Sequence, residues 1–538
     1  MASRRIGRWQ NEKEEKHVTK RKLFAMMLMA SMTMTTVLGG ALVQAEESDA
    51  KWDTSKEDTI TVSVINNFYT AGEKKLAEEY MKMHPETKVV IDVVSDNDTY
   101  KTKMMTSMEG DRSNAPDIVH GNFIGMALTN NSMDLAVDKG YLYDMTEMLD
   151  EENPYNGGLV RDAFTEVDVT LVRSESGGKY TPWLPFDKIG FAVFYNADIL
   201  EAEGIEPPTT YDELASACEK LKAAGYDVPL SAGMESFRLA NTLADAYYRN
   251  NEGEALVQPG DAIWDETTMS ANDGFTFDES NMLCDQFTVF SSERQLKYAS
   301  ENGVNTEANQ KIFEQFYRVA QYFPKNWIGG DSTQAITDFE SQTCPMLYQA
   351  SYNAAMIMND INSLPEDMAF NWGTSQIATF GETPEGFGND LRGYWDFGNI
   401  MSIIATDDQD HLERVKDFYK YWYSKDGAAL CFEETLNNAN YVQGPCVIEG
   451  VTLSEDLEAL LDGFRSAPSK EWACYTGLQW NTTADAPLFN DLMNQFTSGK
   501  ITAEEYLEQE NEVYQNYNNE SIDRAGFDLD PTTEDQAK

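Results

Sequence analysis

The sequence predicts an α/β fold in which helices cover both sides of a parallel β-sheet. Two observations carry this prediction. From about residue 58, short apolar segments alternate with longer segments whose apolar residues recur at helical spacing. One short segment, residues 89–94, is apolar almost throughout, which is typical of a strand buried on both faces. Strands that alternate with helices in this way form parallel sheets.

The first elements can be placed in order along the chain. Alternating apolar residues predict a strand over 60–65, and a helix then runs from about residue 72 to His84, where a proline stops it. The strand over 89–94 precedes a helix over 98–109, and a third strand covers 116–120. These segments predict one region built of strand–helix pairs.

Two loops follow strands in this region, at residues 66–69 and 120–123. Parallel sheets bind ligands at the ends of strands, so we expect these loops to reach a ligand. Their side-chain amides, from Asn66, Asn67 and Asn122, are suited to recognise hydroxyl groups. The alternative is a role in turn formation, which Asn favours in any protein.

A second region begins near residue 189 with a strand over 191–195. Thr210 and Glu213 have the spacing of a capping box and predict a helix that ends at Gly225. Residues 250–285 are polar and weakly periodic, as in a long loop or insertion. The later elements that we expect are strands over 344–348 and 400–404, a helix over 411–424, and a frayed tail from about 528.

The first 45 residues have the composition of a secretory signal. A basic cluster at 20–22 precedes an apolar run that begins at Leu23, and small residues end the segment at Ala45. We therefore expect export and cleavage after Ala45. The alternative is a retained membrane anchor, because residues 23–45 nearly match the length of a bilayer span.

The charge and the cysteines narrow the class of protein further. A formal net charge of −50 argues against nucleic acid as a partner, because phosphate binding needs clustered Lys and Arg. Six cysteines in an exported chain permit disulfides, and Cys431 with Cys446 is the pair that we expect to be bridged. Cys218 lies on the apolar face of a predicted helix and is expected to be a buried thiol.

No sequence motif predicts catalysis, a cofactor or a metal. The chain lacks the H-E-x-x-H helix, the G-x-S-x-G elbow and the phosphate-binding loop. Residues 96–98 hint at calcium but lack the glycine and the distal Glu of a calcium loop. A glycoside hydrolase stays open as an alternative, since 91 Asp and Glu leave room for a catalytic carboxylate pair.

One longer stretch is more specific than periodicity. Residues 194–200 read FYNADIL, and residues 207–214 read PPTTYDEL after a Gly-Ile pair. This stretch resembles a signature of the carbohydrate-type extracellular solute-binding proteins, the maltose-binding-protein-like family that serves ABC importers. Weaker resemblances to the same family occur, in the same order, at 115–119, 140–146, 345–353 and 411–427.

The resemblance implies two α/β lobes that are joined by crossing segments and close around a ligand by a hinge motion. It implies a non-catalytic monomer that captures an oligosaccharide outside the cytoplasm and passes it to ABC permease subunits. No lipid-anchoring Cys follows the signal, in contrast to many relatives. The boundaries that we expect are 1–45 for the signal, 46–188 and 393–445 for lobe 1, and 189–392 and 446–538 for lobe 2. Lobe 2 is expected to contain an insertion over 250–305. The crossings between the lobes are expected near 188–191, 392–399 and 440–446.

A sugar site combines polar side chains with aromatic rings that stack on sugar faces. By resemblance, Trp395 is the first candidate, next to Asp396 and ahead of a crossing. Tyr352 ends a short strand at which relatives often place an aromatic, and Trp183 and Asp187 precede the first crossing. Packing is the alternative role for each aromatic. Weaker candidates are Trp372 and Trp480.

Two further functions share the two-lobed design. A binding protein for peptides or another solute would use the same fold, because the fold does not fix the ligand. A surface sensor or adhesin would capture a ligand without transport. The sequence alone leaves both open.

Overall fold

The computed structural model describes residues 51–66, 68–108, 110, 112–129, 132–165, 168–169, 172, 179–251, 257–262, 264, 291–329, 332–438, 441–464, 472–478, 486–525 and 528–533. The predicted signal, Asn67, Trp480 and most of the predicted insertion lie outside these residues. Within the described ranges, no helix is both long enough and apolar enough to cross a membrane.

The first sheet has the strand order β2–β1–β3–β12–β6. β1 pairs in parallel with β2 and β3, which confirms the three strands predicted for this region. β12 instead runs antiparallel to β3 and β6, so this sheet is mixed. The strands are β1 (Asp58–Ile65), β2 (Thr87–Val94), β3 (Ile118–His120), β6 (Leu184–Pro185) and β12 (Ile400–Ile403).

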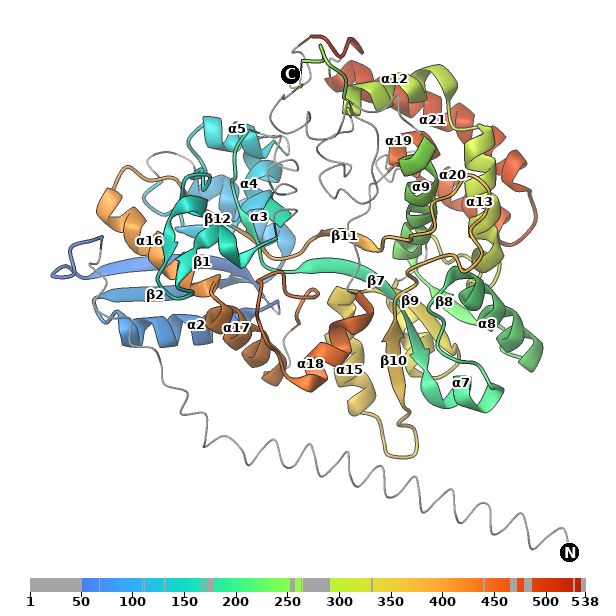
Figure 1. Ribbon diagram of the computed structural model, residues 1–538, viewed down its shortest axis with the longest axis horizontal. Helices are drawn as coiled ribbons and strands as arrows, with labels where there is room; N and C mark the ends of the chain where they lie inside the picture. The colour runs from blue at the N-terminus through green and yellow to red at the C-terminus, as the bar shows by residue number, and fades with distance from the viewer. Residues whose placement is uncertain are drawn as a thin grey trace, which may run out of the picture. The chain divides into compact units, whose positions relative to one another are not determined.

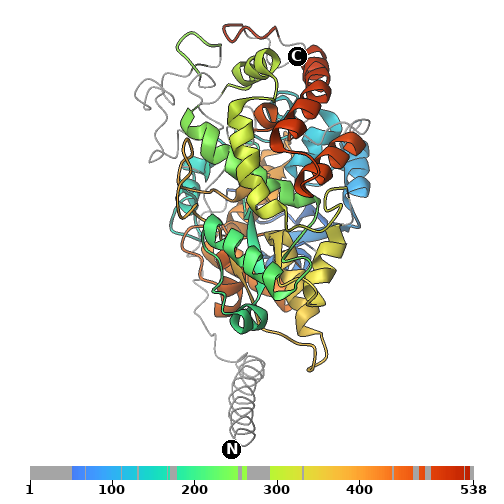
Figure 2. The same cartoon turned by 90° about the vertical axis from the view of Figure 1, so that its right-hand side faces the viewer.

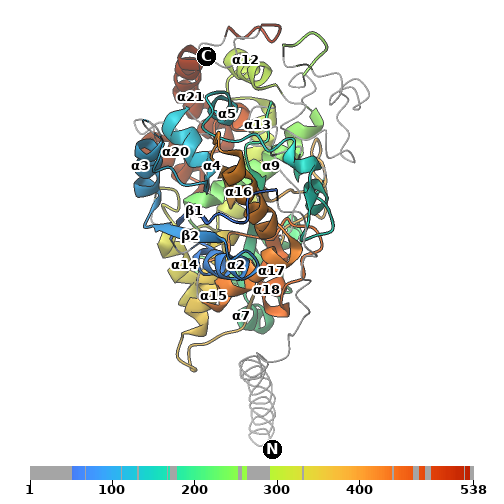
Figure 3. The same cartoon turned by 90° about the vertical axis from the view of Figure 1, so that its left-hand side faces the viewer.

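Helices pack around the first sheet and complete what we call lobe 1. α2 and α17 lie side by side (Figure 3). They approach closely because residue 72 is Gly, since a Cβ there would overlap the Cys431 carbonyl oxygen. The three helices predicted here are confirmed, with ends shifted by one or two residues. The helices are α2 (Thr70–Met83), α3 (Asn97–Ser107), α4 (Gly121–Leu128), α5 (Met133–Asp138), α16 (Gln409–Trp422) and α17 (Lys425–Asn437).

The second sheet has the order β10–β7–β9–β8, and β11 also pairs with β7 (Figure 1). β7 runs antiparallel to β9, β10 and β11, whereas β8 and β9 are parallel. The parallel arrangement predicted for the N-terminal strands therefore holds for β1, β2 and β3 of lobe 1, whereas the second sheet, for which no direction was predicted, is largely antiparallel. The strands are β7 (Lys188–Asn196), β8 (Leu230–Ala232), β9 (Met346–Ala350), β10 (Trp372–Ser375) and β11 (Tyr394–Phe397).

Helices cover both faces of the second sheet and form lobe 2 with it. Successive residues of β7 enter different cores, with Phe194 on one face and Val193 on the other. The Phe194 face packs with α14 (Ser332–Glu340), α15 (Ala354–Asn362) and α18 (Glu455–Leu461). The Val193 face packs with α8 (Tyr211–Ala224), α9 (Arg238–Asn251) and α13 (Glu307–Ala320).

The predicted capping box is confirmed at the start of α8. The Glu213 amide donates to the Thr210 hydroxyl at 3.2 Å, and the Thr210 amide donates to the Glu213 carboxylate at 3.1 Å. Gly225 ends α8 with φ of 106°, a left-handed conformation that suits glycine. A short helix, α7 (Ala197–Glu203), precedes α8.

The chain adds further helices to lobe 2 near its C-terminal end. α21 packs on α13 and α20, and Figure 2 shows these helices together. The Tyr506 ring lies 5.0 Å from Phe313 and 5.4 Å from Phe496, so the contact is apolar. The helices are α12 (Ser292–Asn302), α19 (Ala473–Thr476), α20 (Ala486–Thr497) and α21 (Ala503–Ala525).

Three segments run between the lobes and lie against one another. The first joins β6 to β7, the second joins β11 to β12, and the third follows α17. The Lys188 amide donates to the Pro445 carbonyl at 2.9 Å, and the Gly398 amide donates to the Asp187 carbonyl at 3.3 Å. These segments fall where the crossings were expected, and the finer domain boundaries stay predictions.

The cysteines differ in part from expectation. Cys218 is fully buried on α8, as predicted, and burial raises the pKa of its thiol. The predicted bridge between Cys431 and Cys446 is wrong, because Cys431 is a free, buried thiol among the described cysteines. Cys431 belongs to the core between α2 and α17, where packing and not a covalent link holds the helix.

One ion cluster gives lobe 1 a predicted pH dependence. The ring nitrogens of His411 lie 2.9 Å from an Asp117 carboxylate oxygen and 2.7 Å from one of Asp58. These bonds to Asp117 and Asp58 outweigh burial and raise the pKa of His411 to about 9. A raised histidine pKa stabilises the fold fully below its unfolded pKa of about 6.5, and this contribution is lost as the pH rises through about 9.

We therefore expect His411→Gln to cost about 2 kcal/mol at pH 6 and much less at pH 10. Urea unfolding of the native protein and the variant at both pH values measures this difference. A variant whose deficit is the same at both pH values would show that His411 acts through packing and not through its charge.

Candidate ligand-binding site

The loops that follow β1 and β3 lie at the carboxyl ends of parallel strands, as expected. Asn66 is exposed in the turn after β1, and its backbone amide donates to the Val94 carbonyl at 2.8 Å. Asn122 lies in the first turn of α4, and its side-chain oxygen is buried without a hydrogen bond from any described residue. A buried acceptor without a donor is costly unless a ligand or water supplies one.

Asp187 is fully buried and lies at the first crossing. Its carboxylate accepts the Tyr69 hydroxyl on one oxygen and the Asn399 amide, at 2.7 Å, on the other. Burial raises the pKa of Asp187 to about 6, although these hydrogen bonds oppose the rise. Because both oxygens are already bonded, the geometry favours a role within the crossings over direct ligand contact.

Trp183 is also buried, with 3% of its surface exposed. Its ring packs edge-on against Phe397 at 5.5 Å, next to the second crossing. The packing alternative is therefore the better interpretation of Trp183.

β11 brings Trp395 and Asp396 beside the start of β7. Tyr394 pairs with Gly190 and Asp396 with Ile189, so the register shifts at Trp395. Such a β-bulge redirects side chains and is common next to binding sites. The backbone thus places Trp395 at the crossing, where the sequence expected it.

The Asp396 side chain is exposed to solvent but is surrounded by protein atoms. Its side chain is exposed, yet the protein atoms around it restrict its hydration and raise its pKa to about 6. The Phe397 amide, which donates to it at 2.8 Å, and the Arg238 guanidinium both oppose that rise. Asp396 is therefore accessible to a ligand, while its surroundings disfavour its charged form.

Two polar residues near the site were missed by sequence reasoning. Arg238 begins α9 and acts on Asp396, as described above. Asn241 lies one turn further along α9, is 5% exposed, and neither of its amide atoms bonds to a described residue. The signal that identified the loops of lobe 1, a polar segment directly after a buried strand, is absent after β8, where residues 233–237 read GMESF.

The remaining candidates separate into two places. Tyr352 is half-buried and follows Ser351, whose hydroxyl accepts the Gly190 amide at 3.2 Å, so it lies near the crossings. Trp372 pairs with Asn196 at the other end of β7, and its ring stacks on Phe194 at 6.0 Å. Six residues of strand, roughly 20 Å, separate Gly190 from Asn196, so Trp372 is not brought to the crossings.

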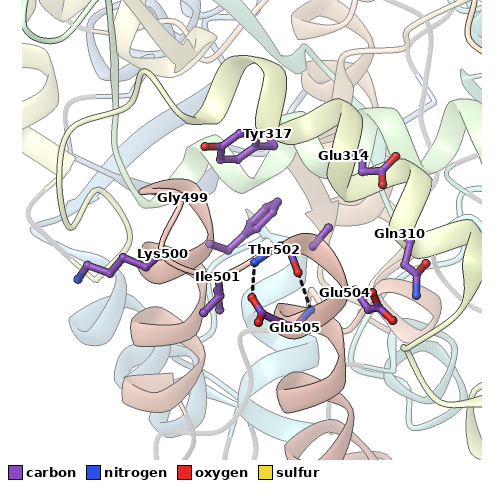
Figure 4. A pocket seen from close by; sticks show the side chains of 11 residues that line it. Gln310, Glu314, Tyr317, Gly499, Lys500, Ile501, Thr502, Glu504 and Glu505 are labelled. Carbon is purple, nitrogen blue, oxygen red and sulfur yellow. Dashed lines mark hydrogen bonds between the residues drawn. The ribbon is translucent and has the colours of Figure 1, made fainter.

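A separate cavity of about 540 Å³ lies between α13 and the turn from α20 to α21 (Figure 4). Its lining includes Tyr317, Lys500 and Glu504, and it contains none of the residues predicted to bind ligand. Thr502 and Glu505 at its edge bond to each other at the start of α21. These groups serve the helix end, and we do not assign the ligand to this cavity.

Comparison with solved structures shows the fold. The apo form of RafE from Streptococcus pneumoniae is 16% identical with a TM-score of 0.55, over 86% of this chain and 98% of that one. A family 1 extracellular solute-binding protein from Bifidobacterium longum subsp. infantis is 15% identical with a TM-score of 0.52, over 86% and 100%. A cyclic alpha-maltosyl-1,6-maltose binding protein from Arthrobacter globiformis is 13% identical with a TM-score of 0.51, again over 86% and 100%. No curated protein matches the chain.

The sequence itself identifies the family. A family model described as bacterial extracellular solute-binding protein matches residues 69–429, which is more than half of the chain. The match begins after β1 and includes the other strands of both sheets and α16, and it agrees with the two-lobed fold. The chain is therefore a member of the bacterial extracellular solute-binding protein family.

Proposed function

We propose that the protein captures an oligosaccharide outside the cytoplasm and delivers it intact to an ABC importer. The observation that carries the proposal is the set of buried amide atoms on Asn122 and Asn241 that lack hydrogen-bond partners among the described residues. Asn122 and Asn241 come from different lobes. Trp395 lies at the crossing between the lobes. Sugar hydroxyls satisfy such amides, and sugar faces stack on aromatic rings.

The solved neighbours support the same ligand class. They include RafE in complex with raffinose, a cyclic alpha-maltosyl-1,6-maltose binding protein and a chitin oligosaccharide binding protein. Family membership supports a binding role without catalysis and partnership with permease subunits. Hinge closure would bring the contacts of both lobes onto one ligand and remove it from water.

Trp395→Ala tests the stacking role directly. We expect the dissociation constant for a bound oligosaccharide to rise about tenfold or more, which corresponds to about 1.4 kcal/mol. Isothermal titration calorimetry with raffinose, maltotetraose and chitotetraose measures it.

The matched control is Trp372→Ala, which removes the same side chain at the far end of β7. Trp372→Ala should leave the dissociation constant unchanged. Equal losses in the two variants would show a general loss of stability, and an unchanged constant in Trp395→Ala would remove Trp395 from the site.

A further inference from the structure

The crossings meet at one buried hydrogen-bonded junction. Asp187, on the first crossing, accepts the Tyr69 hydroxyl and the backbone amide of Asn399, which lies on the second crossing. The Gln443 amide, on the third crossing, donates to the Tyr69 hydroxyl at 3.1 Å. A single tyrosine–carboxylate pair thus bonds to all three crossings. We call these four residues, Tyr69, Asp187, Asn399 and Gln443, the junction.

Tyr69 also fixes the loop after β1. It directly follows Phe68 and precedes α2, and its amide donates to the Tyr441 carbonyl at 3.3 Å. Its ring is fully buried between Phe186 and Phe432, with ring centres 5.4 Å and 5.3 Å away. The loop cannot move far without moving this ring.

The backbone of Tyr69 is held in an unfavourable conformation. Its φ of 49° is in the left-handed region, which bulky residues seldom occupy. Such a conformation persists only where the surroundings enforce it, and it is often found beside functional sites. Here the enforcing contacts are the ring packing and the two hydrogen bonds of the hydroxyl.

We propose that the junction is a positioning device that ties the loop after β1 to the three crossings, so that this loop and the hinge move as one unit. Tyr69 and Asp187 are positioning residues in this account, and neither touches the ligand. The inference rests on the proposed function in one respect: it assumes that the loop after β1 faces the ligand. The coupling between loop and crossings is a property of the free protein.

Tyr69→Phe tests the coupling, because it removes the hydroxyl and keeps the packed ring. We expect hydrogen exchange in the ligand-free protein to become at least tenfold faster at the amides of residues 69 and 399. Neither amide bonds to the Tyr69 hydroxyl itself, since their acceptors are Tyr441 and Asp187. Faster exchange at both would therefore report the release of the whole junction.

The matched control is Tyr211→Phe. The Tyr211 hydroxyl is also buried and donates to the Gln315 carbonyl at 2.7 Å within lobe 2. We expect exchange at residues 69 and 399 to stay unchanged in this variant, with a similar loss of thermal stability in both. Faster exchange at Gln443 alone in Tyr69→Phe would overturn the proposal, because the hydroxyl would then support only its own partner.

The experiment separates this inference from the proposed function. It uses no ligand, so a failure to bind sugar leaves its result unaffected. Conversely, a protein that binds oligosaccharide while residues 69 and 399 exchange normally in Tyr69→Phe would retain the proposed function and lose the junction.

Discussion

Replacing Arg414 with alanine is expected to lower the free energy of unfolding by about 3–5 kcal/mol, because it removes a fully buried charged side chain together with its hydrogen bonds. Arg414 is fully buried on α16. Its guanidinium donates to the carbonyl of Asp53 at 2.6 Å and of Lys56 at 3.0 Å, and to the Thr87 hydroxyl at 3.3 Å. Its loss removes these hydrogen bonds and releases the segment that leads into β1.

Urea unfolding of Arg414→Ala measures this loss, and Arg161→Ala is the control. Arg161 pairs with Asp150 at 2.6 Å, but the two side chains are 46% and 66% exposed. An exposed pair contributes about 0–1 kcal/mol, so the control should remain near the native stability. Equal effects in the two variants would contradict a special role for the buried site.

Gly444→Ala is expected to cost about 3 kcal/mol, at the upper end of the range for overpacking. A Cβ at Gly444 would overlap the carbonyl oxygen of Lys188. That oxygen belongs to the backbone of the first crossing, which the Lys188–Pro445 hydrogen bond holds in place. Unlike a side chain, the backbone carbonyl cannot rotate away from the added methyl group. The crossings must separate to admit the methyl group.

Gly158→Ala is the matched control for this variant. A Cβ at Gly158 would meet a side-chain oxygen of Asp162 at 2.8 Å, and that side chain can move. We expect a loss below about 1 kcal/mol in urea unfolding. If Gly444→Ala were as stable as Gly158→Ala, the close approach of the first and third crossings would be refuted.

Many elements of both lobes could be predicted because their signals are local. The apolar run in β2 and the capping box before α8 each specify an element through neighbouring residues. The match of 194–200 and 207–214 to a family signature then supplied the two-lobed design, which periodicity alone did not.

The strand directions in lobe 2 could not be predicted in the same way. β7 pairs with β9 and β11, which lie about 150 and 200 residues further along the chain, and periodicity does not report the direction of such distant partners. α21 was missed because its amphipathic pattern is weak, although its apolar residues Tyr506 and Leu507 are fully buried.

The roles of individual residues in the candidate site could be predicted from the sequence only in part. Position along the chain placed Trp183, Asp187 and Trp395 near the crossings, but burial favours packing and structural roles for Trp183 and Asp187. Asp187 and Trp183 are enclosed by protein, which no local pattern reveals. Asn241 is recognisable only by its orphaned amide, a property of the folded chain.

The most direct test of the central claim is a thermal-shift measurement on the free protein with oligosaccharides, amino acids and peptides, followed by analysis of each ligand. A ligand at about 100 times its dissociation constant adds about 2.7 kcal/mol, which raises the melting temperature by a few degrees. We predict that an oligosaccharide gives this rise and is recovered unchanged. A rise only with peptides or amino acids, cleavage of the sugar, or no response to any oligosaccharide would contradict the account.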